Sequence, residues 1–206
     1  NLPAFAATIL PRLRVIALLR EPSQRLWLAY WTYGQYPAHY GSSEHGYRAY
    51  FGNASAAYGD CARSRSVREC VLRFEAQGSA QAGVYYHADQ LLKGCYSVFT
   101  AEWQLYAREL LVLRTDDYFA RPSRHVRRVW RFLGLRHPTQ AEVAALRALP
   151  ADDEADKVRT RHGEPTDEMA LRVREFYRPF NEVLARQLGD VGFVRGVWSS
   201  RYVKEA

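Results

Sequence analysis

Residues 14–26 constrain the fold of this chain more than any other segment. Residues 14–20 form an aliphatic run that ends at an arginine, which is typical of a strand covered on both faces in a parallel α/β sheet. Pro22 follows at a position that suits the first turn of a helix, because the N–H that proline lacks has no helical partner there. The segment therefore predicts a buried strand, a turn and a helix over about residues 22–33.

Arg20 is a candidate ligand-binding residue because of its place at the end of this strand. Open α/β sheets bind ligands beside the carboxyl ends of their strands, and the planar fork of donors on a guanidinium fits a phosphate. A strand-end arginine also often pairs with a nearby acid. The spacing alone leaves both roles open, one for a nucleotide phosphate and one structural.

A second strand and several helices complete the predicted α/β architecture. Residues 109–114 are another buried apolar run, and Asp116 and Asp117 follow it. Thr166 is predicted to cap a long C-terminal helix whose first turn carries two acids. We expect further helices over residues 45–58, 85–107, 122–133 and 139–148, and loops over residues 34–48 and 150–165.

The helix predicted for residues 122–133 carries arginines on one face and apolar residues on the other. Gly134 is expected to end it. The charged side is either an ordinary solvated face or a track for an anionic sugar chain. Its members are Arg124, Arg127, Arg128 and Arg131.

The length and the net charge of the chain limit the number of domains and the kinds of binding partner. At 206 residues, the chain is expected to form a single domain, residues 1–206, with a substantial core. Twenty-nine basic and 22 acidic residues give a formal net charge of +7, which favours an anionic partner such as a polysaccharide, a nucleotide, a nucleic acid or a membrane surface. No apolar run approaches the ~20 residues that a membrane helix needs. The charge does not choose among these partners.

The sequence Leu-Arg-Glu-Pro-x-x-Arg-Leu at residues 19–26 resembles the 3′-phosphate-binding segment of the carbohydrate sulfotransferases. Further matches follow in the family's order between about residues 10 and 193, and resemble most the enzymes that sulfate N-acetylgalactosamine 4-sulfate at its 6-position. Each match is weak alone, but their collinear order is specific. They comprise Gly94-x-Tyr96, Trp103, residues 111–117, residues 132–135 and residues 176–181.

This resemblance implies a P-loop-like sulfotransferase fold, with a central parallel sheet flanked by helices. It also implies that 3′-phosphoadenosine 5′-phosphosulfate donates the sulfuryl group and that Arg20 binds its 3′-phosphate. The serine that assists this arginine in the family falls at Leu28, which has no donor. Ser23 is the candidate substitute.

A basic stretch that starts at Lys157 is the second candidate nucleotide contact. By resemblance, Arg159, Arg161 and Gly163 belong to a loop that closes over the nucleotide. The alternative is a solvated charged loop without a ligand.

The Gly-rich loop that holds the 5′-phosphosulfate in this family is not found in the sequence. No Gly-x-x-Lys-x-Gly-Thr-like run occurs, and the catalytic base lies near that loop in the family. We therefore expect the catalytic residues upstream of residue 1, in an N-terminal portion that precedes this chain.

Cys61 and Cys70 resemble a cysteine pair at the same nine-residue offset in these enzymes, which implies a disulfide. Two buried thiols in a reducing compartment are the alternative. Asn53 begins an Asn-x-Ser glycosylation sequon. The family match implies a Golgi-lumen protein of type II topology, whose membrane anchor lies outside this chain.

The predicted function is that of a carbohydrate sulfotransferase acting on a hydroxyl of a glycosaminoglycan-like polysaccharide. The alternative is a non-catalytic anion- or polysaccharide-binding protein of the same fold, which Leu28 and the missing Gly-rich loop favour. No metal is expected, because the histidines lack metal-ligand spacing. No nucleic-acid partner is expected either, because no binding module is recognised.

Overall fold

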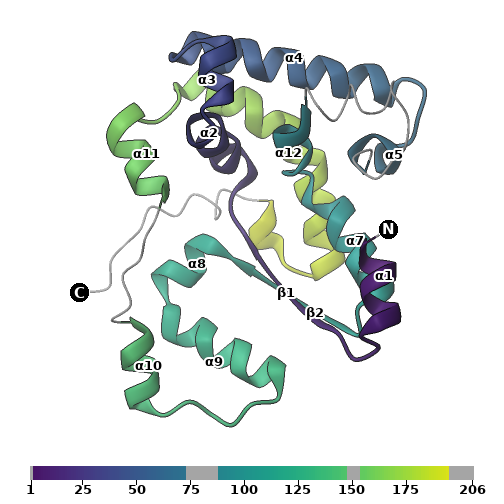
Figure 1. Cartoon of the computed structure of the whole chain (residues 1–206), viewed down its shortest axis with the longest axis vertical. Coiled ribbons are helices and arrows are strands. Elements are labelled where there is room, and N and C mark those ends of the chain that lie inside the picture. Colours follow the sequence, from purple (N-terminus) through teal and green to yellow (C-terminus); the bar gives the residue numbers. More distant parts are fainter. Residues whose placement is uncertain (1, 73–87, 148–153, 195–206) are drawn as a thin grey trace. The chain divides into compact units, whose positions relative to one another are not determined.

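The computed structural model describes residues 2–72, 88–147 and 154–194 of the chain. It is mostly helical, with a small parallel sheet (Figure 1). The chain divides into two compact units, which are described separately. Unit 1 consists of residues 1–21, 100–153 and 185–206, and unit 2 consists of residues 22–99 and 154–184.

The sheet belongs to unit 1. Strands β1 (Arg14–Leu19) and β2 (Glu109–Arg114) pair in parallel, in a register that aligns the first residue of one strand with the first residue of the other. Arg14 Nη2 donates a hydrogen bond to Glu109 Oε1 at 3.3 Å where the two strands begin. Both strands occur where the sequence predicts them, and their parallel pairing is compatible with an α/β fold.

The burial of β1 differs from the prediction. Ile16 and Leu18 are 39% and 49% exposed, whereas Leu111 and Leu113 on β2 are 7% and 4% exposed. Successive side chains of a strand point to opposite faces, so residues 16 and 18 share one face. Their partners in the register, Leu111 and Leu113, lie on the same face, so the described residues cover this face over β2 but only partly over β1. The expectation of a strand buried on both sides is therefore wrong for β1.

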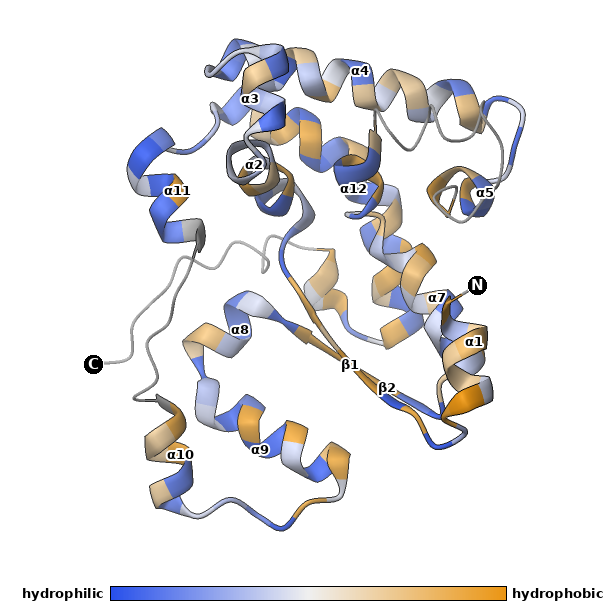
Figure 2. Cartoon of the chain, viewed as in Figure 1, coloured by the Kyte–Doolittle hydropathy of each residue, from blue (hydrophilic) through white to orange (hydrophobic). Residues whose placement is uncertain are grey.

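The other elements of unit 1 are short helices. α9 confirms the predicted amphipathic helix, and Figure 2 shows polar and apolar residues alternating around it. Gly134 ends α9 in the left-handed conformation, with φ at 72°, as expected for a C-terminal glycine. These elements are α1 (Leu2–Ile9), α8 (Thr115–Ala120), α9 (Pro122–Leu133), α10 (Gln140–Arg147) and the 3-10 helix η2 (Val191–Phe193).

Unit 2 is helical and has an aromatic core. Its elements are α2 (Pro22–Thr32), α3 (Gln35–Tyr40), α4 (Glu44–Ala62), α5 (Val67–Val71) and α11 (Glu154–His162), together with most of α12 (Asp167–Leu188) and the start of α7 (Tyr96–Tyr106). Tyr30, Tyr47, Tyr50 and Tyr177 are fully buried. Buried hydroxyls usually have a hydrogen-bond partner, and that of Tyr177 donates to the carbonyl oxygen of Leu91 at 2.8 Å. No helix in the described ranges is both long and apolar enough to cross a membrane.

The predicted loop over residues 34–48 is wrong. α3 and the first turn of α4 occupy most of it, because Tyr36 and Tyr47 insert into the aromatic core and are 7% and 1% exposed. Ser43 starts α4 by accepting a hydrogen bond from the backbone N–H of Gly46 at 3.2 Å. The polar composition of residues 34–48 predicts a surface loop, although two of its tyrosines are buried.

Gly94 breaks the helix predicted over residues 85–107. The first predicted residues, 85–87, lie outside the described residues. Residues 88–92 are helical, and α7 begins at Tyr96. A Cβ on Gly94 would lie 2.6 Å from the ring of Tyr177, so only glycine allows this close approach. The break in the predicted helix therefore has a packing cause.

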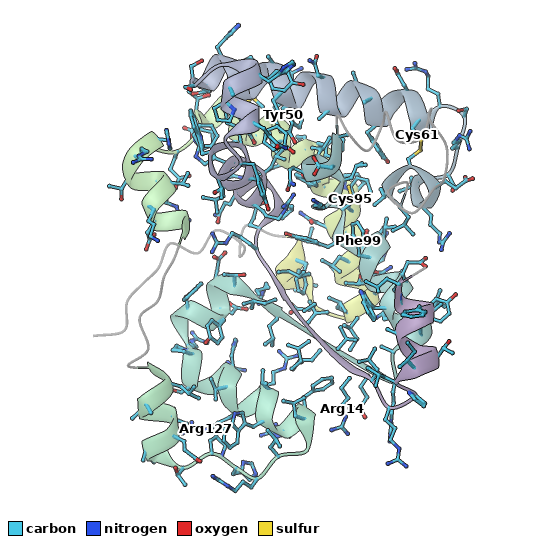
Figure 3. The ribbon with its side chains drawn as sticks, viewed as in Figure 1. Arg14, Tyr50, Cys61, Cys95, Phe99 and Arg127 are labelled. Carbon is cyan, nitrogen blue, oxygen red and sulfur yellow. A yellow bond between two sulfur atoms is a disulfide. The ribbon has the colours of Figure 1, made fainter. Side chains whose placement is uncertain are left out.

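A disulfide joins Cys61, at the end of α4, to Cys70 in α5. Figure 3 labels Cys61 and shows the bond between the two sulfur atoms. Both cysteines are buried. The pairing implied by the family resemblance is confirmed.

Candidate functional site

Arg20 lies directly after β1 and two residues before α2 begins. Its side chain is partly exposed and already interacts with another group of the chain. The carboxyl end of a parallel strand and the start of a helix both favour an anion. The structure thus gives Arg20 the local setting that the sequence predicts.

The backbone before Arg20 is held by the neighbouring strand. Thr115 follows β2 as the first residue of α8, and its Oγ1 donates a hydrogen bond to the carbonyl oxygen of Leu19 at 3.0 Å. Thr115 is 6% exposed, so water does not compete for this bond. The bond restrains the point from which the Arg20 side chain departs.

Arg114 anchors the end of β2 to the C-terminal part of unit 1. Its Nε donates to Asp117 Oδ2 at 2.6 Å, and its guanidinium carbon lies 5.4 Å from the centre of the Phe193 ring. Asp190 lies 4.0 Å from the same guanidinium. Arg114 is therefore engaged in contacts within the chain and has a structural role.

Ser23 and Leu28 lie on α2, at the positions considered for the hydroxyl partner of Arg20. Ser23 is 7% exposed in the first turn and interacts with another group of the chain. Leu28 is partly buried against the core of unit 2. An apolar side chain in that position contributes packing and cannot donate a hydrogen bond.

The basic stretch after residue 154 is a helix, so the loop predicted over residues 150–165 is wrong for α11. Val158 explains the difference, because it is 7% exposed and belongs to the core of unit 2. α11 ends at Gly163, whose φ of +71° is the left-handed conformation that favours glycine. A single buried valine thus fixes a helix whose other residues are mainly charged.

Arg159 and Arg161 differ in their surroundings although both belong to α11. Arg159 donates to Asp156 Oδ1 at 3.1 Å and its Nε lies 2.8 Å from Glu164 Oε1. Arg161 is exposed, and the described residues provide it with no acidic partner. Arg161 is therefore the freer of the two cations to bind an anion.

Trp27 holds the end of α11 against α2. Its Nε1 donates a hydrogen bond to the carbonyl oxygen of Gly163 at 3.1 Å. Trp27 is 3% exposed and meets the Tyr47 ring edge-on, with the ring centres 4.8 Å apart. Gly163 thus has a structural contact to the core in addition to any ligand role.

A pocket of about 810 Å³ lies between the last turn of α2 and α11 in unit 2. Trp31 and His162 stack in it, with ring centres 3.8 Å apart and planes 8° apart. Burial and, to a smaller extent, the charge of Arg161 lower the pKa of His162. Both effects favour the neutral form of the His162 imidazole.

The pocket combines features that suit an anionic sugar or a nucleotide. Trp31 supplies an aromatic surface, Arg161 a guanidinium, and Thr32 and Thr160 hydroxyl groups. A guanidinium binds sulfate or phosphate with paired donors. The described residues contain no group of three His, Cys, Asp or Glu side chains that could hold a metal ion.

No family model and no solved structure matches the chain. The human protein named carbohydrate sulfotransferase 15 is 26% identical over 192 residues, which are 92% of this chain and 32% of the human protein. The mouse protein of that name gives the same identity and coverage, and the protein of the squid Nototodarus sloanii is 25% identical over 131 residues, 63% of this chain and 78% of the squid protein.

The chain is similar in sequence to proteins named carbohydrate sulfotransferase 15. This relationship confirms the resemblance inferred from the residue motifs. The chain spans about a third of the length of the mammalian carbohydrate sulfotransferases that it matches.

The structure identifies residues near the basic stretch that sequence reasoning missed. Trp31, Thr32, Thr160 and His162 line the pocket beside Arg161. The signal in the sequence is faint, since Trp27 and Trp31 are four residues apart on one helix and a histidine follows Arg161. The two segments are far apart in the sequence and meet only in the folded chain.

Proposed function

We propose that this protein is a carbohydrate sulfotransferase that transfers a sulfuryl group from 3′-phosphoadenosine 5′-phosphosulfate to a hydroxyl of a glycosaminoglycan-like polysaccharide. One observation carries the proposal. Arg20 stands between a parallel strand and a helix, in a chain that matches carbohydrate sulfotransferase 15 over 92% of its length.

In this proposal Arg20 binds the 3′-phosphate of the donor through paired N–H groups, which grip a phosphate better than an ammonium does. Ser23 supplies the hydroxyl that Leu28 lacks. Arg161 contributes a second positive charge toward the nucleotide. Arg159 and Gly163 hold the end of α11, Arg159 through its acidic neighbours and Gly163 through Trp27.

The transfer itself is a displacement at sulfur. The acceptor hydroxyl oxygen forms a bond to sulfur while the bond from sulfur to the 5′-phosphate oxygen breaks, and the hydroxyl proton passes to a base. Positioning and charge stabilisation dominate such a reaction, as in phosphoryl transfer. We place the Gly-rich loop and the catalytic base in a segment upstream of residue 1.

The proposal extends to the fold and the compartment. The parallel strands fit a P-loop-like sulfotransferase fold, to which both units would contribute as one domain. The Cys61–Cys70 disulfide fits an oxidising compartment such as the Golgi lumen. Asn53 is exposed on α4 and is accessible for glycosylation. The membrane anchor of a type II protein would lie outside this chain.

Sulfate transfer by the natural full-length protein tests the proposal. The assay measures incorporation of labelled sulfate from the nucleotide donor into chondroitin sulfate, for wild type and for Arg20→Ala. Arg12→Ala is the matched control, because Arg12 is exposed and lies before β1. We expect a large loss with Arg20→Ala and none with Arg12→Ala.

Binding of 3′-phosphoadenosine 5′-phosphate, measured in parallel, separates the possible failures. Equal incorporation by wild type and Arg20→Ala would refute the role of Arg20. Intact nucleotide binding without transfer to any sugar acceptor would refute the enzymatic function and favour a non-catalytic binding protein.

A further inference from the structure

The positive charge of this chain is concentrated in one segment. Residues 118–141 contain six arginines and no lysine, aspartate or glutamate, whereas the whole chain has a formal net charge of +7. The rest of the chain is therefore close to neutral. The six are Arg121, Arg124, Arg127, Arg128, Arg131 and Arg136.

Four of these arginines lie on one face of α9. At about 100° per residue, Arg124, Arg127, Arg128 and Arg131 fall within an arc of roughly 100° around the helix axis. Arg124, Arg128 and Arg131 are exposed, and Arg127, labelled in Figure 3, is partly exposed. The arginine stripe, as we call these four residues, extends over about 10 Å of the helix.

The arginine stripe lacks the acidic partners that other arginines have. Arg48 lies 2.7 Å from Glu168, and Arg178 lies 3.0 Å from Glu175. Arg136, outside the stripe, pairs with Glu142 and lowers the pKa of that carboxyl to about 2. In contrast, the described part of the chain places no carboxylate within ion-pair distance of any of the four stripe arginines.

Within the described residues, the stripe makes one side-chain hydrogen bond, a long one of 3.5 Å from Arg127 to Gln140. Like charges three or four residues apart on a helix repel each other and destabilise it. An acid in any of the intervening positions would relieve this repulsion, yet none occurs. An anion with several charged groups would relieve this repulsion.

We propose that the arginine stripe of α9 binds a sulfated polysaccharide, as a surface distinct from the residues assigned to the nucleotide. A linear sulfated chain presents anionic groups in a row, which is complementary to a row of guanidinium groups. The choice of a sugar chain rests on the proposed function. The apolar side of α9 packs toward the fold, since Val126, Val129 and Trp130 are partly buried.

The test compares two triple variants of the full chain with the same change in charge. Arg124→Gln, Arg128→Gln and Arg131→Gln together neutralise three of the four stripe arginines while keeping good helix formers. Arg12→Gln, Arg65→Gln and Arg174→Gln together remove three exposed arginines elsewhere. The probes are a chondroitin sulfate oligosaccharide, the unsulfated oligosaccharide of equal length, a DNA duplex, and anionic phospholipid vesicles.

We expect the stripe variant to lose roughly tenfold or more in affinity for chondroitin sulfate, and the control variant to stay close to wild type. Raising the salt concentration should weaken wild-type binding much more than binding by the stripe variant. Circular dichroism and thermal unfolding of both variants check that they keep the helix content and stability of wild type.

Equal losses in the two triple variants would overturn the proposal, because binding would then follow net charge and not the stripe. Tighter stripe-dependent binding to DNA or to vesicles would overturn the sugar chain as the partner. Stripe-dependent binding in a protein that transfers no sulfate would support the stripe and refute the enzymatic function, so the two failures are distinguishable.

Discussion

The hydroxyl of Thr115 donates a hydrogen bond to the carbonyl oxygen of Leu19 at 3.0 Å, and so connects the end of β2 to the residue before Arg20. The two residues are 96 positions apart in the sequence. The geometry at the proposed phosphate-binding arginine therefore depends on a residue that would not itself touch the ligand.

Replacing Thr115 by valine should lower both stability and nucleotide affinity. The valine has nearly the same shape but leaves the Leu19 carbonyl without this donor, which should cost about 1 kcal/mol in the free energy of unfolding. Urea denaturation and binding of 3′-phosphoadenosine 5′-phosphate measure the two effects. Thr115→Ser keeps the hydroxyl and should retain most of the stability and most of the nucleotide affinity. Equal stability and equal affinity in the two variants would show that the hydrogen bond to Leu19 is unimportant.

Two glycine-to-alanine changes should shift stability in opposite directions. In Gly94→Ala the new methyl group meets the Tyr177 ring at 2.6 Å, so we expect a loss of about 1–3 kcal/mol from overpacking. In Gly52→Ala, within α4, no atom lies within 4 Å of the new Cβ, so we expect a gain of about 0.5–1 kcal/mol. Thermal or urea unfolding measures both. A gain with Gly94→Ala would contradict the packing at the break before α7.

Removing the disulfide should destabilise unit 2. Cys61 and Cys70 are nine residues apart, and opening so short a loop should cost about 2–3 kcal/mol in a chain-entropy model. Urea unfolding of the double variant Cys61→Ser, Cys70→Ser measures the loss. A reducing agent should lower wild-type stability to the level of this variant and leave the variant itself unchanged.

Acidification should destabilise the protein through His125. Burial is the main cause that lowers the pKa of His125, and neither ring nitrogen has a hydrogen-bond partner in the described residues. The unfolded state then binds the proton more readily than the folded state, so the stabilising contribution is complete above the unfolded pKa of about 6.5 and is lost as the pH falls below it.

The variant His125→Phe places another aromatic ring beside Tyr118, and this ring cannot be protonated. Unfolding free energies measured between pH 5 and 8 should therefore fall less steeply with acid in this variant than in wild type. Identical slopes would show that the titration of His125 does not differ between the folded and unfolded states.

The two arginines of α11 should contribute unequally to nucleotide affinity. Arg161→Gln removes a cation without an acidic partner in the described residues, so we expect affinity for 3′-phosphoadenosine 5′-phosphate to fall roughly fivefold to tenfold. Arg159→Gln should have the smaller effect on affinity, because that cation is engaged by Asp156 and Glu164. The reverse order, measured by calorimetry, would reassign the site to Arg159.

The strands and the long amphipathic helices could be predicted from the sequence because their periodicity or apolar runs are local signals. α9 and its terminal glycine follow directly from residues 122–134. α3 and α11 could not be predicted, because each depends largely on one apolar residue, Tyr36 or Val158, that enters a core built by distant segments. The pocket was missed for the same reason, since Trp31 and His162 meet only through folding.

The concentration of arginines between residues 118 and 141 also affects how the protein approaches a partner. An otherwise nearly neutral molecule with one strongly positive segment has a large electric dipole, so the field of a polyanion turns the molecule before contact. Encounters would then begin at α9 more often than random orientation allows. If the stripe binds such a polymer, the same asymmetry would let the molecule move along it without leaving it, because each guanidinium could exchange one anionic group for the next.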